Sequence, residues 1–187
     1  MLNTPMTAAA AAIARRAHEG QLDKAGEPYI NHPLTVAESM DTEEETCVAL
    51  LHDVIEDSAF TAADLREAGM PDAVVEAVEL LTHDEAVDYF DYVRAVRENP
   101  LAAKVKRADL EHNLDASRLR RRLTAIDMKR QSRYRVALDI LDGKDGATGV
   151  GASGHVPPAP HAPARPRGAQ PAEAAAAPCA PMQGDHA

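Results

Sequence analysis

Four residues between positions 52 and 57 are of types that do chemistry together: His52, Asp53, Glu56 and Asp57. If this stretch is helical, each member of the second pair lies one turn beyond a member of the first, because residues four apart share a helix face. The neighbouring residues are apolar, and an isolated buried charge costs on the order of several kcal/mol. The four side chains are therefore paired, hydrated or metal-bound, or they form an ordinary solvated face, and this stretch alone leaves both interpretations open.

Two other segments carry residues that could join this group. His32 stands at the expected first turn of a short helix, and Asp109 and Asn113 share a helix face at i and i+4. Each segment also has an ordinary structural interpretation, since His32 could be a helix-cap histidine and Asp109 a surface partner of Lys106 or Arg107. Two imidazoles and two carboxylates together would suit six-coordinate Mn²⁺ or Fe²⁺ better than Mg²⁺, which prefers all-oxygen shells. The candidate metal ligands are His32, His52, Asp53 and Asp109.

The elements that must position these residues all read as helices. Apolar residues recur at spacings of three and four, while glycine, proline and capping residues mark the ends. Nothing alternates with period two over a useful length, so the sequence predicts an all-α bundle. The expected helices cover residues 4–18, 33–40, 42–57, 61–69, 71–81, 84–98, 101–120 and 125–141, with either Asp41 or Thr42 as the cap of the third.

The composition changes sharply towards the C-terminus. Residues 143–187 hold eight of the 13 prolines and seven of the ten glycines, with no Leu, Ile, Phe or Tyr. Such a segment buries too little apolar surface to offset the entropy of ordering it, so we expect a disordered Pro/Ala/Gly-rich tail. Residues 1–142 fit a single domain with one core.

The charge balance limits the classes of partner. The chain carries 20 basic and 30 acidic side chains, a net charge of −10, which argues against general binding to nucleic acid or to anionic membranes. A basic strip remains at residues 104–135, with eleven basic and four acidic side chains. We see no secretory leader and no apolar run long enough to span a membrane, and therefore expect a cytoplasmic protein. The two cysteines, Cys47 and Cys179, give no support for a disulfide or a zinc site.

Four segments carry a resemblance to a known family: Ala17–Gln21, Gly26–Leu34, Ala49–Asp57 and Val105–Asn113. The order of chemical residues in them, His, then His-Asp, then Asp, resembles the HD superfamily of metal-dependent phosphohydrolases. The surrounding sequence is similar, over about residues 7–140, to the hydrolase domain of RelA/SpoT homologues, including the small stand-alone hydrolases. That domain removes the 3′-pyrophosphate of (p)ppGpp with Mn²⁺, giving GDP or GTP and pyrophosphate. The resemblance thus implies an HD-domain bundle that acts on a guanosine polyphosphate.

The resemblance also implies a role for individual residues. The metal ligands are the four candidates named above, and Glu56 and Asp57 match the catalytic acid pair that positions and deprotonates the attacking water. Asn113 matches a contact to the nucleotide sugar. Lys24 matches a phosphate-binding residue in the loop after the first helix, and Tyr134 matches a tyrosine of the last helix that lies beside the nucleotide.

One departure from the family pattern bears on the substrate. Where relatives commonly have two adjacent basic residues, this chain has Asp23 and Lys24, so a negative charge replaces one expected phosphate contact. The basic run 118–122 could compensate, or it could be a solvated helix end. Three functions are therefore open: alarmone hydrolysis, hydrolysis of another nucleotide such as a 3′-phosphorylated cofactor or a deoxynucleotide, and non-catalytic binding of a nucleotide or a metal. The intact acid pair speaks against the third.

Overall fold

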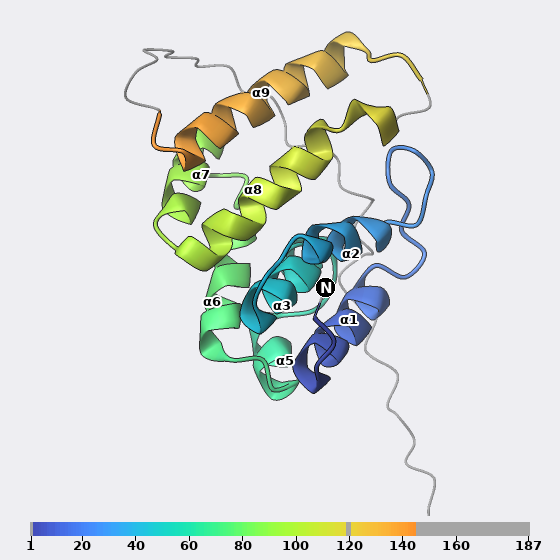
Figure 1. The fold of residues 1–187 in the computed structure, drawn as a ribbon, viewed down its shortest axis with the longest axis vertical. Helices are drawn as coiled ribbons and strands as arrows, with labels where there is room; N and C mark the ends of the chain where they lie inside the picture. The colour runs from blue at the N-terminus through green and yellow to red at the C-terminus, as the bar shows by residue number, and fades with distance from the viewer. Residues whose placement is uncertain (1, 119–120, 145–187) are drawn as a thin grey trace, which may run out of the picture.

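The computed structural model describes residues 2–118 and 121–144. In this part of the chain the regular elements are helices, with one isolated bridge between Leu22 and Pro28. The all-α prediction is therefore confirmed, and Figure 1 shows the arrangement. The bounds are α1 Pro5–Ala17, α2 Asn31–Glu38, α3 Glu43–Leu51, α4 Val54–Asp57, α5 Ala62–Glu67, α6 Asp72–Leu81, α7 Tyr89–Arg97, α8 Pro100–Leu114, the 3₁₀ turn η1 Ala116–Arg118, and α9 Ala125–Leu141.

Helix α3 lies at the centre of the bundle. It contacts α1, α2, α6 and α8 (Figure 1). Its second half, Cys47–Leu51, is five consecutive residues with no exposed surface, and a helix that is apolar on every side needs neighbours on every side. Helix α8 links this centre to the remainder of the fold, because it packs on α2 and α3 and also on α7 and α9. The candidate residues of α2, α3 and α8 are thus brought to one region.

Threonine capping boxes start several helices. In α3, α5 and α9, the hydroxyl of Thr42, Thr61 and Thr124 accepts a hydrogen bond from the backbone N–H three residues later, and the acidic side chain there accepts one from the threonine N–H. These reciprocal bonds satisfy donors that a helix start otherwise leaves open. The predicted helix start at Thr61 is confirmed, and of the two candidate caps for α3, Asp41 and Thr42, the structure has Thr42.

The box at the start of α9 is expected to respond to pH. The Arg121 guanidinium, 2.6 Å from the Asp127 carboxylate, and the hydrogen bonds from Thr124 hold the pKa of Asp127 well below its usual range. A depressed carboxyl pKa stabilises the fold above about pH 4 and loses this effect as the pH falls below that value. We expect Asp127→Asn to lower the free energy of unfolding by about 1 kcal/mol at pH 7, and by less near pH 3. Urea unfolding followed by circular dichroism measures both values.

Asp64→Asn is the matched control for this variant. Asp64 occupies the same box position in α5, but it is exposed, and its carboxylate accepts hydrogen bonds from the backbone N–H and the hydroxyl of Thr61 without a basic side chain such as Arg121 beside it in the described structure. We therefore expect a smaller loss of stability from Asp64→Asn than from Asp127→Asn. Equal losses at pH 7 would contradict a contribution from the Arg121 pair.

Three helix boundaries differ from the prediction for local reasons. Helix α2 begins two residues before Pro33, because a proline in the first turn gives up an N–H that has no intrahelical acceptor anyway. Helix α7 begins after Asp88 and not at residue 84, since the Asp88 carboxylate accepts two backbone N–H groups at that point. Helix α8 ends before Asp115, which has extended backbone, so residues 115–118 do not continue it as predicted.

A further prediction, one continuous helix over residues 42–57, is wrong. Helix α3 ends at Leu51, a turn follows at His52 and Asp53, and α4 begins at Val54. The interruption falls at His52 and Asp53, two of the candidate metal ligands, so an unbroken helix does not describe how they lie relative to Glu56 and Asp57.

Part of the sequence-based interpretation concerns residues beyond the described ranges. Apart from Gly143 and Lys144, the expected tail lies outside them, as do positions 119 and 120 of the basic run. Within the described ranges, no helix combines the length and the apolarity that crossing a bilayer would need.

Candidate active site

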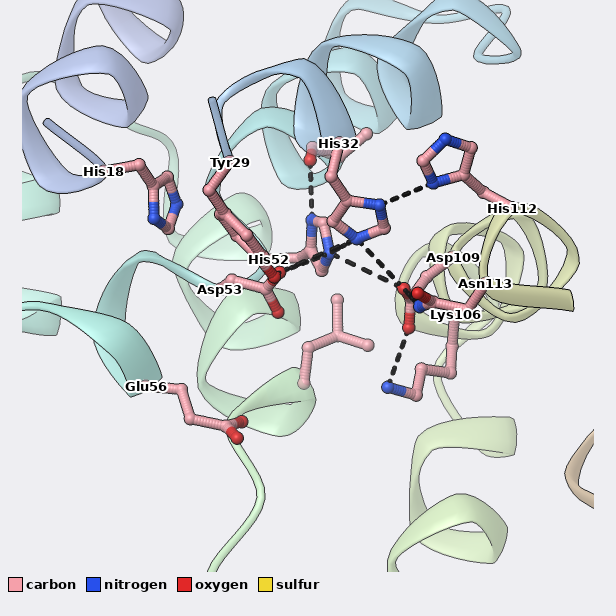
Figure 2. Close-up of polar contacts among 12 residues, drawn as sticks. His18, Tyr29, His32, His52, Asp53, Glu56, Lys106, Asp109, His112 and Asn113 are labelled. Atoms are coloured by element: carbon pink, nitrogen blue, oxygen red, sulfur yellow. Dashed lines mark hydrogen bonds and ion pairs between the residues drawn. The ribbon is translucent and has the colours of Figure 1, made fainter. Parts of the chain in front are cut away.

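Four polar side chains from three parts of the fold meet between α2, α3 and α8 (Figure 2). His32 comes from α2, His52 and Asp53 from the turn between α3 and α4, and Asp109 from α8. The Nε2 atom of His32 lies 3.2 Å from Nε2 of His52 and 3.1 Å from Oδ1 of Asp109. The Oδ2 atom of Asp53 lies 3.0 Å from Nε2 of His52 and 3.7 Å from Nε2 of His32. All four residues are buried.

The four side chains fit a divalent metal ion. Donor atoms of His32, His52 and Asp109 all lie within 4.8 Å of one another, and the Asp53 carboxylate adjoins both rings. The two carboxylates stabilise positive charge at this point of the site. Burial disfavours a charged His52 ring, but the attraction of Asp53 and Asp109 outweighs burial and raises the pKa of His52 to about 9. Two imidazoles and two carboxylates around one point form a donor set that divalent transition metals accept. One cation would balance the buried negative charge and use all four donors.

The break between α3 and α4 explains how His52 faces this point. Its ring Nδ1 lies 2.7 Å from the carbonyl oxygen of Ala49, and since a carbonyl can only accept, Nδ1 carries the proton. A neutral ring protonated at Nδ1 presents the Nε2 lone pair, which is the form that binds a metal. The local fold therefore fixes both the direction of the ring and its tautomer.

Asp109 is held by two neighbours on its own helix. The Lys106 ammonium lies 3.0 Å from Oδ2, and the Asn113 amide donates to Oδ1 at 2.6 Å (Figure 2). Burial opposes the charge on both partners of the Lys106 pair, but their attraction outweighs it, raising the pKa of Lys106 and lowering that of Asp109 well beyond their usual ranges. The sequence left open that Asp109 is only a surface partner of Lys106. The two residues do pair, but they pair inside the site and not on the surface, with side chains 15% and 7% exposed.

Asp53 has a partner that sequence reasoning missed. The Tyr29 hydroxyl donates a hydrogen bond of 2.5 Å to Oδ2 of Asp53. Burial and the adjacent Asp53 carboxylate raise the pKa of Tyr29 well above its usual value, so the phenol stays protonated as a donor. Tyr29 lies three residues before His32, in the segment Gly26–Leu34 that carries the family resemblance. This proximity to a candidate ligand is the one feature of the sequence that could have indicated a role for Tyr29.

The predicted acid pair, Glu56 and Asp57, lies on α4 beside the four-residue cluster. Glu56 is half-buried, and its Oε2 accepts the backbone N–H of His83 at 3.0 Å. Figure 2 shows its side chain set apart from the histidines and aspartates. Asp57 is buried with only 4% of its surface exposed, and its carbonyl oxygen accepts a hydrogen bond from the Gln21 side chain at 2.9 Å. Glu56 is therefore the more accessible acid of the two.

The predicted substrate contacts lie outside the metal cluster, except for Asn113. Lys24 stands in the loop between α1 and α2; loss of water around its ammonium and the like charge of Arg130 lower the pKa of Lys24 to about 8. Tyr134 is buried on α9, with 8% of its surface exposed. Two basic residues of α9, Arg130 and Arg133, were not among the predicted substrate contacts. Arg130 lies near Lys24, and the Arg133 guanidinium stacks over the ring of Tyr89.

Two charged side chains of uncertain role in the sequence have structural partners. The Asp23 carboxylate accepts the backbone N–H groups of Ala25 and Glu27 at 2.8 and 3.0 Å, and thereby shapes its own loop. Arg121, in the basic run, pairs with Asp127 at the start of α9. Of the two alternatives for the run 118–122, phosphate compensation or an ordinary structural role, Arg121 therefore has a structural role.

A protein-family model described as an HD domain matches residues 10–131. The chain belongs to the HD domain family. Among curated proteins, this HD domain is 38% identical over 116 residues to guanosine-3′,5′-bis(diphosphate) 3′-pyrophosphohydrolase of Haemophilus influenzae, an alignment covering 54% of the chain and 17% of that protein. It is 42% identical over 91 residues to the bifunctional (p)ppGpp synthase/hydrolase SpoT of Escherichia coli, covering 46% and 13%. The predicted resemblance to RelA/SpoT homologues is thereby confirmed, although the chain spans less than a fifth of either relative.

A solved structure shares the fold of this HD domain. It is described as a metazoan ortholog of SpoT that hydrolyzes ppGpp and plays a role in starvation responses. The superposition has a TM-score of 0.58 at 23% sequence identity, and it covers 79% of the HD domain chain and 89% of the other chain. At this identity the likeness supports the fold alone.

Proposed function

We propose that this HD domain is a metal-dependent phosphohydrolase that removes the 3′-pyrophosphate of (p)ppGpp, giving GDP or GTP and pyrophosphate, with Mn²⁺ as the cation. The observation that carries the proposal is the buried convergence of His32, His52, Asp53 and Asp109, with Glu56 on the helix that follows Asp53. The names of the two bacterial relatives, both of which refer to this substrate, support the choice of nucleotide.

Each part of the site has a task in this reaction. The two histidines and two aspartates would hold the cation, whose Lewis acidity makes a nearby water easier to deprotonate and polarises a phosphoryl oxygen. Glu56 accepts the proton of the attacking water, whose oxygen bonds to the phosphorus on the 3′ oxygen. The bond from that phosphorus to the 3′ oxygen breaks, the 3′ oxygen regains a proton, and pyrophosphate leaves. Asp57, buried at the end of α4, is the second acid of the pair and helps to position the attacking water.

Cationic side chains on the loop after α1 and on α9 suit a polyphosphorylated substrate. Arg130 lies close enough to Lys24 for its positive charge to lower the pKa of Lys24, and an anion bound by both side chains would relieve this repulsion. Asn113 and Tyr134 would lie by the nucleoside, with Asn113 also bound to Asp109. Asp23 points to its own loop backbone, so its negative charge is partly compensated by N–H donors and does not by itself exclude a substrate with two diphosphates.

A direct assay tests the proposal. The purified chain is incubated with Mn²⁺ and ppGpp, and release of pyrophosphate and GDP is followed with and without a chelator. We expect metal-dependent release. Hydrolysis of other nucleotides without hydrolysis of ppGpp would favour the second function, which the departure at Asp23 motivates, and no turnover of any nucleotide would favour a binding protein.

The assignment of Lys24 to phosphate binding predicts a pH dependence. With its pKa lowered to about 8, Lys24 is charged below that pH and loses its proton, and so its attraction for phosphate, above it. We expect KM for ppGpp to rise as the pH passes about 8, and Lys24→Gln to raise KM about tenfold at pH 7, the lower end for a hydrogen bond between charged groups. Steady-state kinetics from pH 6.5 to 9.5 measure both effects.

Lys24→Arg provides the control, because arginine stays protonated throughout this range. Its KM should stay flat where that of the wild type rises. Parallel pH profiles for wild type and Lys24→Arg would contradict the assignment.

A further inference from the structure

The described residues contain a contact to a metal ligand that the proposed mechanism does not use. The Nδ1 atom of His112, on α8, lies 2.6 Å from Nδ1 of His32, on α2 (Figure 2). The two rings are stacked, with centroids 4.8 Å apart and planes inclined by 25°. His112 follows Asp109 by three residues on the same helix, so α8 carries both a candidate ligand and a neighbour of the ligand opposite.

We infer that His112 is a positioning residue that fixes the tautomer and the ring orientation of His32 for metal binding. The inference rests on the metal-binding part of the proposed function. His32 faces His52 and Asp109 through its Nε2 atom, and a cation at that point takes the Nε2 lone pair. The proton of the neutral His32 ring must then be on Nδ1, where His112 is the hydrogen-bond partner.

The required acceptor restricts His112 as well. If Nδ1 of His32 donates, Nδ1 of His112 must accept, so His112 is neutral and carries its own proton on Nε2. His52 reaches the same tautomer by a different route, because its Nδ1 donates to the backbone carbonyl of Ala49. The two metal-binding histidines thus have different supports: a carbonyl, which no side-chain substitution removes, and an imidazole, which a substitution can replace.

This difference gives a matched pair of variants. His112→Phe keeps a flat ring that can stack on His32 but removes the acceptor. His112→Asn removes the ring but can place its amide oxygen near the position of the lost Nδ1. Loss of an outer partner of a metal-bound histidine typically weakens metal affinity ~10- to 100-fold. We expect a loss of this size for His112→Phe and recovery of most of the affinity in His112→Asn.

The experiment measures metal binding without nucleotide. Mn²⁺ and Zn²⁺ are titrated into the full chain and the two variants by calorimetry, and thermal melts of the metal-free proteins compare their folding. Two-bond ¹H–¹⁵N spectra of the Zn²⁺-loaded wild type report the tautomers directly. They should show His32 protonated at Nδ1 and His112 at Nε2, and this readout does not depend on any variant folding.

Each outcome decides between the alternatives. Unchanged affinity in His112→Phe, equal losses in both variants, or a spectrum with the His32 proton on Nε2 would overturn the positioning role. A wild type that binds no divalent cation would overturn both this inference and the proposed metal site. A wild type that binds metal and shows the expected tautomers but releases no pyrophosphate from ppGpp would overturn the proposed hydrolase activity alone.

Discussion

Asp109→Ala is expected to abolish tight metal binding and hydrolysis together. Asp109 is the one acid that α8 contributes to the cluster, and its Oδ1 lies 3.1 Å from Nε2 of His32 and 4.0 Å from Nε2 of His52. Removing it takes away a donor and half of the carboxylate charge that balances a cation. The loss of metal affinity should exceed the ~10- to 100-fold that losing an outer partner costs. Metal analysis after gel filtration and the pyrophosphate assay measure the two effects.

The same substitution should also lower stability, because it leaves Lys106 without its carboxylate. The Lys106 side chain is only 15% exposed, and removing one partner of a buried ion pair typically costs ~3–5 kcal/mol. Asp109→Asn is the control, since its amide oxygen still accepts from Lys106 although its charge is gone. We expect Asp109→Asn to lose metal but less stability in urea unfolding. A full complement of metal in Asp109→Ala would contradict the ligand assignment.

Residue types and their order along the chain were enough to predict the candidate metal ligands. Buried carboxylates and imidazoles need partners, and the three segments that carry them do meet between α2, α3 and α8. The sequence could not show how the chain orients His52 and Asp53. A continuous helix from residue 42 to 57 was expected, but the bond from the His52 ring to the Ala49 carbonyl accompanies a break. Side-chain bonds to nearby carbonyls compete with helix geometry without leaving a periodic signal.

The neighbours of the ligands were harder to predict for a different reason. Tyr29 and His112 contact Asp53 and His32 across distances of 24 and 80 residues along the chain. Such contacts depend on the angle at which helices cross, which spacing along one helix does not contain. Both residues lie in the segments that carried the family resemblance, yet neither has an obvious role from its type alone. Only the packing of the folded chain shows that these two residues contact candidate metal ligands.

Glu56→Gln is expected to retain metal and stability but to lose most turnover. Glu56 is half-buried on α4, and its Oε2 accepts the His83 N–H at 3.0 Å. The amide oxygen of glutamine can accept the same N–H, so the local fold should persist. An amide cannot take the proton of the attacking water, and loss of a general base typically costs ~10²- to 10⁴-fold in rate. Single-turnover hydrolysis of ppGpp at saturating Mn²⁺ measures this loss separately from binding.

Asp57→Asn tests which carboxylate takes the proton. Asp57 is buried, so we expect Asp57→Asn, which puts an amide in place of a buried carboxylate, to lower the stability as well as the rate. The hydrogen bond from Gln21 to the backbone carbonyl of residue 57 remains possible in this variant. A general base should also leave a pH signature: the acidic limb of the wild-type rate profile should disappear in Glu56→Gln. If Asp57→Asn removes that limb while Glu56→Gln keeps it, Asp57 is the base and Glu56 only orients the water. If both variants keep it, the group that titrates lies elsewhere in the site and the proton acceptor is neither acid of α4.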